Sequence, residues 1–363
     1  MTSAMLLGGS ASAWGAIPTE SAVPPSTAPA ASTTPGTSTP AAAAPSYRAV
    51  LIDPTAIIPA GQSIVDSSVG GASSTGLIVG NVTLQSGDTM ITRGFVSSPD
   101  GPARWVDASP ASGCRLTAAW DISSSGEVAG AATCPGVPAP SGVRIAPDGT
   151  TTILDTKPGY TTQVASINDR GTILGRINYS TQTQYVLDAV LWPAVGASRI
   201  TDVSSVDQYM WGLSNTDMVV GSRAGVASYS VGTAELDRAL STPSAQANGG
   251  AISPNGKIAV GYTAVGAQRY IPGGPASSVS GAAGFQVTSV NDAGRAIGWV
   301  STPTAEYDAV WQRGVSRPLL DVTQDLPAGW RTLAVELTNT GDIAVQAWDA
   351  QGKPHAMRLV ALN

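Results

Sequence analysis

The sequence predicts an all-β fold, a seven-bladed β-propeller of four-stranded blades, on three observations. The 363 residues include 41 glycines and 26 prolines, a supply of turns that excludes a long helical bundle. There are only three lysines and five glutamates against 20 aspartates, so turn formers outnumber these helix formers. A turn motif also recurs along the chain at a spacing typical of propeller blades.

The repeat is clearest in residues 165–175, Ala-Ser-Ile-Asn-Asp-Arg-Gly-Thr-Ile-Leu-Gly, and in residues 288–298, Thr-Ser-Val-Asn-Asp-Ala-Gly-Arg-Ala-Ile-Gly. Its turn residue falls at seven positions: Gly76, Gly126, Gly171, Asp217, Gly256, Gly294 and Gly341. They are 38 to 50 residues apart, close to the length of a four-stranded blade. Seven copies predict seven blades. Copies four and five are short, so six blades with one copy as an insertion is the alternative.

Each copy is expected to contribute four strands. An apolar strand leads into an Asn/Asp/Ser-rich turn with glycine where φ is positive, and a second strand follows. In the third copy, residues 188–192 then predict a third strand and residues 199–203 a fourth.

The seventh copy lacks a fourth strand, because the chain ends at Asn363 soon after its third. Residues 47–53, Tyr-Arg-Ala-Val-Leu-Ile-Asp, resemble the fourth strands of other copies, such as residues 318–322. We expect this N-terminal strand to complete the seventh sheet. Closure of this kind protects sheet edges.

The N-terminal segment predicts export. Residues 1–13 hold a short apolar run followed by Ala-Ser-Ala, a small-x-small pattern typical of a signal-peptide cleavage site. We interpret them as a remnant export signal, with an arbitrary small-residue terminus as the alternative. Residues 14–46, rich in Ala, Ser, Thr and Pro, predict a disordered tether, and residues 47–363 the propeller. The expected location is secreted, cell-surface or periplasmic.

These repeats resemble those of the bacterial extracellular HAF-repeat proteins, in which an Ile-Asn-x-x-Gly-x-Ile-x-Gly hairpin precedes His-Ala-Phe-Leu-Trp. The hairpin half matches at residues 167–175 and 290–298. The second half matches as Asp-Ala-Val-Leu-Trp at 188–192, Asp-Ala-Val-Trp at 308–311 and His-Ala-Met at 355–357. Copies four and five depart from the pattern, with Asp217 in place of glycine and one extra residue before Gly261. The resemblance implies export and a propeller-like fold, and no particular chemistry.

Charge and residue content limit the expected partners and cofactors. The formal charge is −6 and there is no basic cluster, which argues against a nucleic-acid partner. No apolar run is long enough for a membrane-spanning helix. His355 is the only histidine, which argues against a Ser-His-Asp triad or a multi-histidine metal site; within its repeat it is expected to form a hydrogen bond inside its own blade. We expect no cofactor and no metal.

The two cysteines, Cys114 and Cys134, lie symmetrically about residue 124, inside the turn of the second copy. In an antiparallel hairpin they would face one another across two strands. We therefore predict a disulfide, with two buried free thiols as the alternative.

The predicted ligand-binding residues lie in the longer connections, which share one face of a propeller opposite the short turns. They are mostly aromatic residues with two acids: Tyr160, Tyr209, Trp211, Trp330, Tyr179, Tyr307, Trp348, Asp207 and Asp325. Aromatic rings beside carboxylates suit sugars, which have apolar and hydroxylated faces. For each ring the alternative is packing against its own loop, and for Trp211 packing in the core.

Three functions remain open on sequence alone. The first is an exported binding module for a carbohydrate or other extracellular ligand, with a glycan or surface polymer as partner. The second is a carbohydrate-active hydrolase or lyase that uses two of the loop acids Glu306, Asp207 and Asp325. The third is a structural repeat protein of an envelope or matrix. The sequence does not specify the ligand or the oligomeric state.

Overall fold

The chain divides into two units, Met1–Ala42 and Ala43–Asn363. The computed structural model describes residues 45–99, 101–106, 113–137, 140–154, 161–180, 185–194, 201–202, 209–223, 226–229, 247–263, 266–270, 277–278, 284–302 and 305–362. All of these belong to the second unit. The expected export signal, residues 1–13, and nearly all of the expected tether, residues 14–46, lie outside them.

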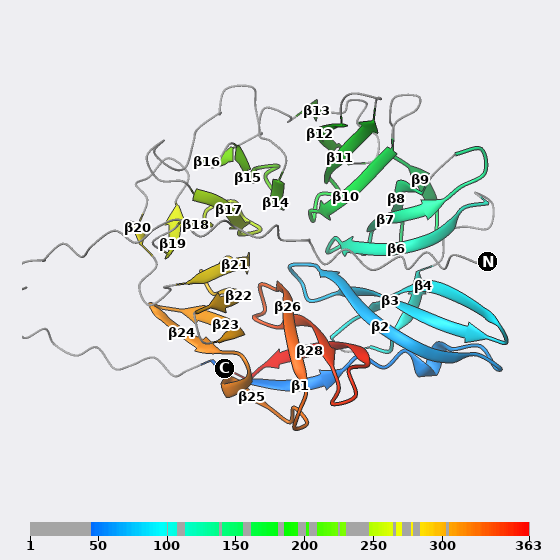
Figure 1. Ribbon diagram of the computed structural model, residues 1–363. Helices are drawn as coiled ribbons and strands as arrows, with labels where there is room; N and C mark the ends of the chain where they lie inside the picture. Colours follow the sequence, from blue (N-terminus) through cyan, green and yellow to red (C-terminus); the bar gives the residue numbers. More distant parts are fainter. Residues whose placement is uncertain are drawn as a thin grey trace, which may run out of the picture. The chain divides into compact units, whose positions relative to one another are not determined.

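The described strands form seven sheets, and five of these are four-stranded blades in a β-propeller arrangement. In Figure 1 the sheets follow one another in chain order within the second unit. The first strands are β2 (Ser63–Ala72), β6 (Arg115–Ile122), β10 (Thr161–Ile167), β14 (Tyr209–Leu213), β17 (Ala247–Ile252), β21 (Phe285–Val290) and β26 (Arg331–Leu337). The second strands are β3 (Ile78–Ser86), β7 (Val128–Thr133), β11 (Ile173–Ser180), β15 (Val219–Arg223), β18 (Ala259–Thr263), β22 (Ala296–Ser301) and β27 (Ile343–Trp348).

The outer strands complete each sheet. The third strands are β4 (Thr89–Ser97), β8 (Ser141–Ile145), β12 (Tyr185–Trp192), β16 (Val226–Tyr229), β19 (Gly266–Tyr270), β23 (Glu306–Gln312) and β28 (Pro354–Ala361). The fourth strands are β5 (Arg104–Val106), β9 (Thr151–Ile153), β13 (Thr201–Asp202), β20 (Ser277–Ser278) and β24 (Val315–Pro318). The β14–β16 sheet has three described strands, and residues 230–246, which follow it, lie outside the described part of the chain.

The last sheet has the order β25-β1-β28-β27-β26 and joins the two ends of the propeller. β1 (Tyr47–Leu51) pairs antiparallel with β28, from Tyr47 opposite Ala361 to Leu51 opposite Met357. The predicted pairing of the N-terminal strand with the last repeat is therefore confirmed. β25 (Thr323–Gln324) pairs with the outer edge of β1, and two 3-10 helices, η1 (Thr55–Ile57) and η4 (Leu320–Val322), lie in connections.

The repeated turns have the predicted backbone geometry. All seven turn residues have positive φ, from 60° at Asp217 to 94° at Gly341. A residue with a side chain is strained at positive φ, and glycine is favoured there. Asp217 is the one residue of the seven that is not glycine, as the sequence of copy four predicts. The structure also contains the extra residue of copy five. Ser253 N–H donates to Ile258 O, five residues later, whereas the equivalent hydrogen bond in each other copy joins residues four apart.

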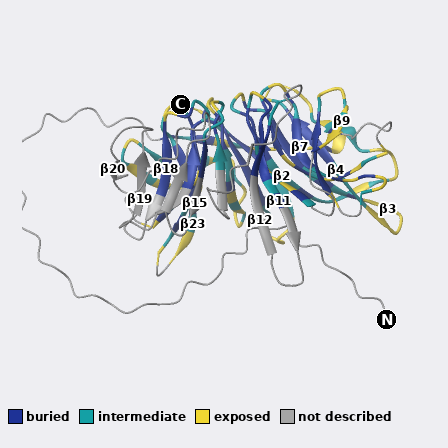
Figure 2. Cartoon of the chain, turned by 90° about the horizontal axis from the view of Figure 1, so that it is seen from above, coloured by how far each residue is buried: buried dark blue, intermediate teal, exposed yellow. Residues whose placement is uncertain are grey.

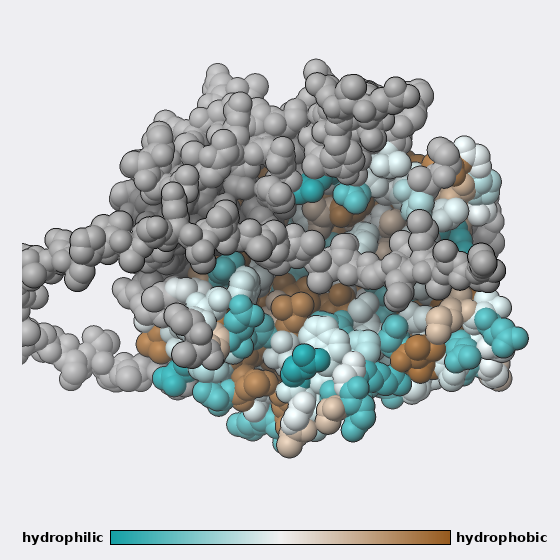
Figure 3. Space-filling view, in the orientation of Figure 1, coloured by the Kyte–Doolittle hydropathy of each residue, from teal (hydrophilic) through white to brown (hydrophobic). Residues whose placement is uncertain are grey.

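The hydrophobic core lies between neighbouring sheets. Val79 and Val96 of the first sheet cluster with Leu116, Val128 and Ile145 of the second. Figure 2 shows buried residues along the strands and exposed residues gathered in the turns. On the face drawn in Figure 3, hydrophobic residues of the described surface occur in small groups among hydrophilic ones. No helix among the described residues is long and apolar enough to cross a membrane.

The disulfide prediction is confirmed. Cys114 and Cys134 are bonded, one position beyond the Arg115–Thr133 pair of the β6–β7 hairpin. Cys134 is buried and belongs to the core cluster between the first two sheets, so the bridge also ties the end of the hairpin to that core.

Each first strand carries a β-bulge at the same repeat position. The register shifts there lie between Val69/Gly71, Ala119/Asp121, Val164/Ser166, Met210/Gly212, Gly249/Ala251, Val287/Ser289 and Ala334/Glu336. A bulge re-aims the side chain that follows it. Asp121, Ser289 and Glu336, three residues that follow a bulge, join neighbouring sheets.

Candidate functional site

The turns between first and second strands are linked to one another by hydrogen bonds, which we call the turn ring. Asn339 N–H donates to Ser74 O (3.0 Å), and Ser74 Oγ donates to Asp169 Oδ2 (2.5 Å). Asp169 N–H donates to Asn215 Oδ1 (2.9 Å), and Asn215 N–H donates to Pro254 O.

The other half of the turn ring closes the circuit. Asn255 N–H donates to Asp292 Oδ1 and Asp292 N–H to Asn339 Oδ1, both at 2.9 Å. Ser124 N–H joins the second copy through Asp169 Oδ1 (2.8 Å). Every copy therefore contributes at least one residue to the turn ring.

The Asn-Asp pair of the repeat motif has a structural function in this ring. Asn168 Oδ1 accepts the N–H groups of its own turn, while its Nδ2 donates to Ser214 O in the next copy (2.7 Å). Asn291 repeats this arrangement with Thr338 O (3.1 Å). The Asn residue of the motif thus connects one turn to the next.

Two carboxyl groups lie beside Gly71, close to the turn ring. A Cβ atom on Gly71 would lie 2.5 Å from Asp121 Oδ1 and 3.1 Å from Glu336 Oε2, so only glycine leaves room for both. Asp121 Oδ2 accepts Ile167 N–H of the following sheet (2.8 Å) and Glu336 Oε2 accepts Ala72 N–H of the first sheet (2.9 Å). Each acid therefore links its own sheet to the next.

Burial raises the pKa of both acids. For Glu336 burial raises the pKa from 4.5 to about 7, with a smaller contribution from the negative charge of Asp169. For Asp121 burial is again the first cause and the charge of Glu336 the second, and the pKa is well above the ordinary value. Such a pair can hold a proton near neutral pH. Since their oxygens accept N–H groups across sheet junctions, their first function is to join the sheets.

A small cavity lies at this end of the first strands. Its wall combines polar groups, among them Ser74, Asp169, Asn215 and Glu336, with apolar side chains such as Ile167. β26 runs from Arg331 to Leu337, and a strand rises about 3.3 Å per residue. The cavity, which Leu337 lines, is therefore roughly 20 Å from the opposite end of β26, where the predicted binding residue Trp330 lies.

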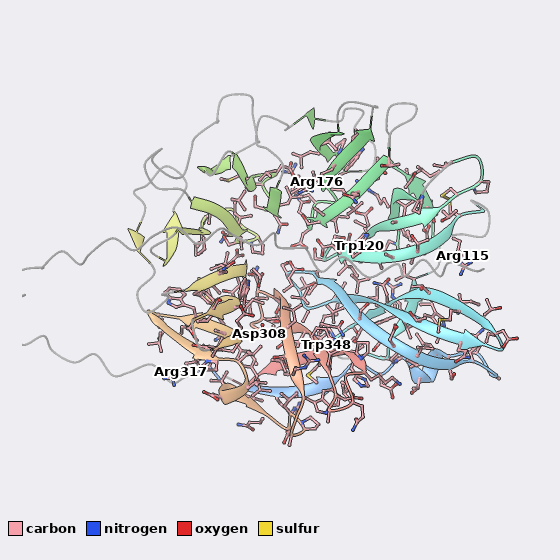
Figure 4. The ribbon with its side chains drawn as sticks, in the orientation of Figure 1. Arg115, Trp120, Arg176, Asp308, Arg317 and Trp348 are labelled. Atoms are coloured by element: carbon pink, nitrogen blue, oxygen red, sulfur yellow. A yellow bond between two sulfur atoms is a disulfide. The ribbon has the colours of Figure 1, made fainter. Side chains whose placement is uncertain are left out.

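At that opposite end, the last sheet carries five residues that we call the tryptophan cluster: Trp330, Arg331, Trp348, Asp349 and His355. Trp348 pairs with Arg331, whereas the neighbouring residue Ala347 pairs with His355, so the Trp348 and His355 side chains lie on opposite faces of the sheet. Trp330 precedes β26 and stacks on His355, with ring centroids 4.9 Å apart and planes inclined by 26°. Arg331 lies opposite Trp348 in the β26–β27 pair, with its guanidinium carbon 5.8 Å from the Trp348 ring centroid. Figure 4 shows Trp348 beside β26.

Asp349 holds this cluster in place. Its Oδ1 accepts the N–H groups of Gln351 (3.0 Å) and Lys353 (2.8 Å), and its Oδ2 lies 3.0 Å from His355 Nε2. The hydrogen bond with His355, followed by those from the backbone, lowers the pKa of Asp349. His355 therefore bonds within its own blade, as predicted, while its ring supports Trp330.

Comparison with known proteins bears on the fold alone. No family model and no curated protein matches the chain. A prolyl endopeptidase structure is similar over 83% of this chain and 48% of that one, with TM-score 0.52 and 14% identity. The chain thus spans about half the length of that protein. An oligogalacturonate lyase in complex with manganese is similar over 83% of this chain and 97% of that one, with TM-score 0.51 and 9% identity. A fungal lectin of six-bladed propeller fold, Aleuria aurantia lectin, gives TM-score 0.31 at 12% identity over 83% and 96% of the two chains.

Two of the predicted ligand-binding residues, Trp330 and Trp348, lie at the same end of the last sheet. Trp330 packs against the core of that sheet and stacks on His355, and Trp348 lies beside Arg331. Tyr307 lies on β23 and packs against the core that its own sheet forms with the β17–β20 sheet. Asp325 is exposed, with φ of 62°, in the connection that leads to Trp330. Glu306 is exposed at the start of β23, where Ser301 Oγ donates to it.

The other predicted residues belong to parts with little or no description. Tyr160 and Asp207 lie outside the described residues, and the side chains of Tyr179, Tyr209 and Trp211 lie outside the described part as well.

Sequence reasoning did not anticipate the acids beside Gly71. A signal for them exists. When the copies are aligned on the turn, Asp121 and Glu336 both stand two residues before its first residue. A charged residue so close to the end of an apolar strand departs from the pattern of a buried strand, and such departures indicate positions with a particular structural or functional role. Asp308 also links neighbouring sheets. Its Oδ2 accepts Ala334 N–H of the next sheet (3.1 Å), and Figure 4 places it toward β26. The repeat position that Asp308 shares with His355 predicted a hydrogen bond within its own blade instead.

Proposed function

We propose that this chain is an exported binding module, a seven-bladed β-propeller that recognises a carbohydrate through the tryptophan cluster. Support for seven blades comes from the seven described sheets and from the turn ring, which includes one turn from each copy. Neighbouring sheets also contact one another around the whole circuit, including β2 with β26, β27 and β28.

The observation that carries the binding proposal is the placement of Trp330 and Trp348 at one end of the last sheet. Both side chains are partly exposed, and each is fixed by a neighbour, His355 for Trp330 and Arg331 for Trp348. A rigid aromatic surface loses little conformational entropy when a ligand stacks on it. Hydrogen-bonding groups beside the rings, as on Arg331 and Lys353, suit the hydroxyl groups of a sugar.

Export is supported by the Cys114–Cys134 bridge, because disulfides persist in oxidising compartments. The sequence pattern of residues 1–13 and the resemblance to the HAF-repeat proteins agree with this location. An extracellular polymer or surface glycan is therefore the expected class of ligand.

A glycan array tests the proposal. Wild-type protein should bind a defined set of glycans, and Trp330→Ala should lose binding while a thermal melt shows that the variant is folded. Trp105→Ala is a matched control, because Trp105 is a partly buried tryptophan on β5 of another sheet. Absence of glycan binding by the wild type would instead favour a structural function in an envelope or matrix.

A further inference from the structure

We infer that the tryptophan cluster selects acidic saccharides, those whose sugar rings carry a carboxylate, over neutral ones. This inference rests on the proposed function and adds a ligand class to it. It comes from the charges that remain available around the two tryptophans after the internal contacts of the cluster are counted.

Both oxygens of the acid of the cluster, Asp349, already have partners within the protein. These are two backbone N–H groups on Oδ1 and His355 on Oδ2. A carboxylate held in this way by its own turn and its neighbour has little capacity left to accept hydroxyl groups of a ligand. The cluster therefore does not offer the free carboxylate that neutral-sugar recognition often uses.

Two cations, Arg331 of the cluster and the nearby Lys353, are exposed to solvent. Arg331 is exposed and lies over Trp348 through its guanidinium group. Lys353 is exposed, and its Nζ contacts Ile64 O at 3.5 Å. Asp66 and Asp325 are the acids on the flanking segments. Among the described residues neither forms an ion pair with Arg331 or Lys353.

These features favour a ligand with an apolar ring face and an anionic group at its edge. The Arg331 guanidinium lies over one side of the Trp348 ring, 5.8 Å from its centroid. The indole surface that it leaves uncovered can stack on the ring face of the sugar, and the guanidinium can donate two parallel hydrogen bonds to a carboxylate. A uronic-acid residue combines both parts in a single sugar. A neutral hexose would stack equally well and would gain no ion pair with the guanidinium.

Calorimetric titration with matched oligosaccharides tests this inference. The probes are oligomers of mannuronate, galacturonate and glucuronate, each beside the same oligomer after chemical reduction of its carboxyl groups to primary alcohols. The wild type should bind at least one acidic oligomer roughly tenfold more tightly than its reduced form, as expected for a charge-assisted pair. The difference should shrink as salt rises from 50 to 300 mM.

Two variants distinguish charge from packing. Arg331→Gln should remove most of the preference, because it should weaken binding of the acidic oligomer far more than binding of the reduced one. Arg317→Gln, on β24 of the neighbouring sheet, should retain it. Equal binding of acidic and reduced oligomers by the wild type would overturn the inference and leave the binding module standing. Binding of neither form would overturn both the inference and the proposed function.

Discussion

Glu336 on β26 accepts a hydrogen bond from the backbone N–H of Ala72 on β2, at 2.9 Å, although 264 residues separate them. A second bond crosses the same junction, from Val69 N–H to Gln346 Oε1 at 3.0 Å. The first and last sheets are thus joined by side chains near the ends of the first strands as well as by the strand β1. The two ends of the propeller are therefore joined both by strand pairing and by side-chain hydrogen bonds.

Stability should depend on pH through Glu336. Its pKa is about 7 in the folded protein and 4.5 in the unfolded chain, so the folded state retains a proton that the unfolded chain releases between these values. This contribution is fully present below about pH 4.5 and is lost as pH rises through 7. Melting temperature should therefore fall between pH 6 and 7.5, above the pKa of Asp308 at about 6.

The variant Glu336→Gln tests this effect, because glutamine keeps an oxygen for Ala72 N–H and has no proton to release. It also removes the negative charge that raises the pKa of Asp121. Its melting temperature should vary less over the same pH interval. A slope identical to that of the wild type would show that Glu336 does not titrate there.

Asp169 should be among the most important residues of the turn ring for stability. Its carboxylate accepts Ser74 Oγ, Ser124 N–H and Asn215 Nδ2, three bonds from three other copies. Asp169→Ala should lower the free energy of unfolding by roughly 2 to 4 kcal/mol, since hydrogen bonds to charged groups contribute about 1.5 to 3 kcal/mol each and are not additive. Urea denaturation measures the change.

Asp148→Ala is the control for that measurement. Asp148 also caps a turn, but it bonds only Thr150 close by in sequence and lies on an exposed turn. Asp148→Ala should lower the free energy of unfolding by less than about 1 kcal/mol. Equal losses in the two variants would mean that the contacts between copies add nothing to stability.

Reduction of the Cys114–Cys134 bridge should destabilise the protein without unfolding it at room temperature. The bridge closes a loop of about 20 residues, which corresponds to ~3 kcal/mol in the chain-entropy model. Intact mass should rise by two hydrogens on reduction, and the melting temperature should fall. Full alkylation of both cysteines without a reductant would contradict the bridge.

Removal of β1 should open the last sheet. Tyr47 is fully buried in that core and its hydroxyl accepts a hydrogen bond from Arg295 Nη1 (3.2 Å), so its loss costs on the order of 3 to 5 kcal/mol. A chain that begins at Pro54 should melt well below one that begins at Ser46. The shorter truncation should melt like the full chain. Equal melting temperatures of the two truncated chains would refute the contribution of β1.

Local patterns allowed the repeat, its turns, the disulfide and the N-terminal closing strand to be predicted from sequence. Each depends on nearby residues or on symmetry between copies, as with the positive φ of Asp217, which follows from its place in the motif. The acids beside Gly71 were not predicted, because their proximity arises from the sheet junctions and the bulges in β6 and β26. The engagement of Asp349 by His355 likewise depends on side-chain geometry within a long hairpin.

The candidate site was predictable only in part. Sequence indicated Trp330 and Trp348 as ligand-binding residues on the face with longer connections, and both lie at that end of the last sheet. It gave no sign that Arg331 would lie over Trp348, since that contact depends on the register of β26 and β27.

The most direct test of the account is a calorimetric titration of wild type, Trp348→Ala and Trp120→Ala with the best ligand from the glycan array. Trp120 is an exposed tryptophan on β6 and is not part of the tryptophan cluster (Figure 4). Loss of a stacking tryptophan should weaken binding roughly tenfold or more. The account predicts this loss for Trp348→Ala and unchanged affinity for Trp120→Ala, with both variants folded. Undiminished binding by Trp348→Ala would contradict it.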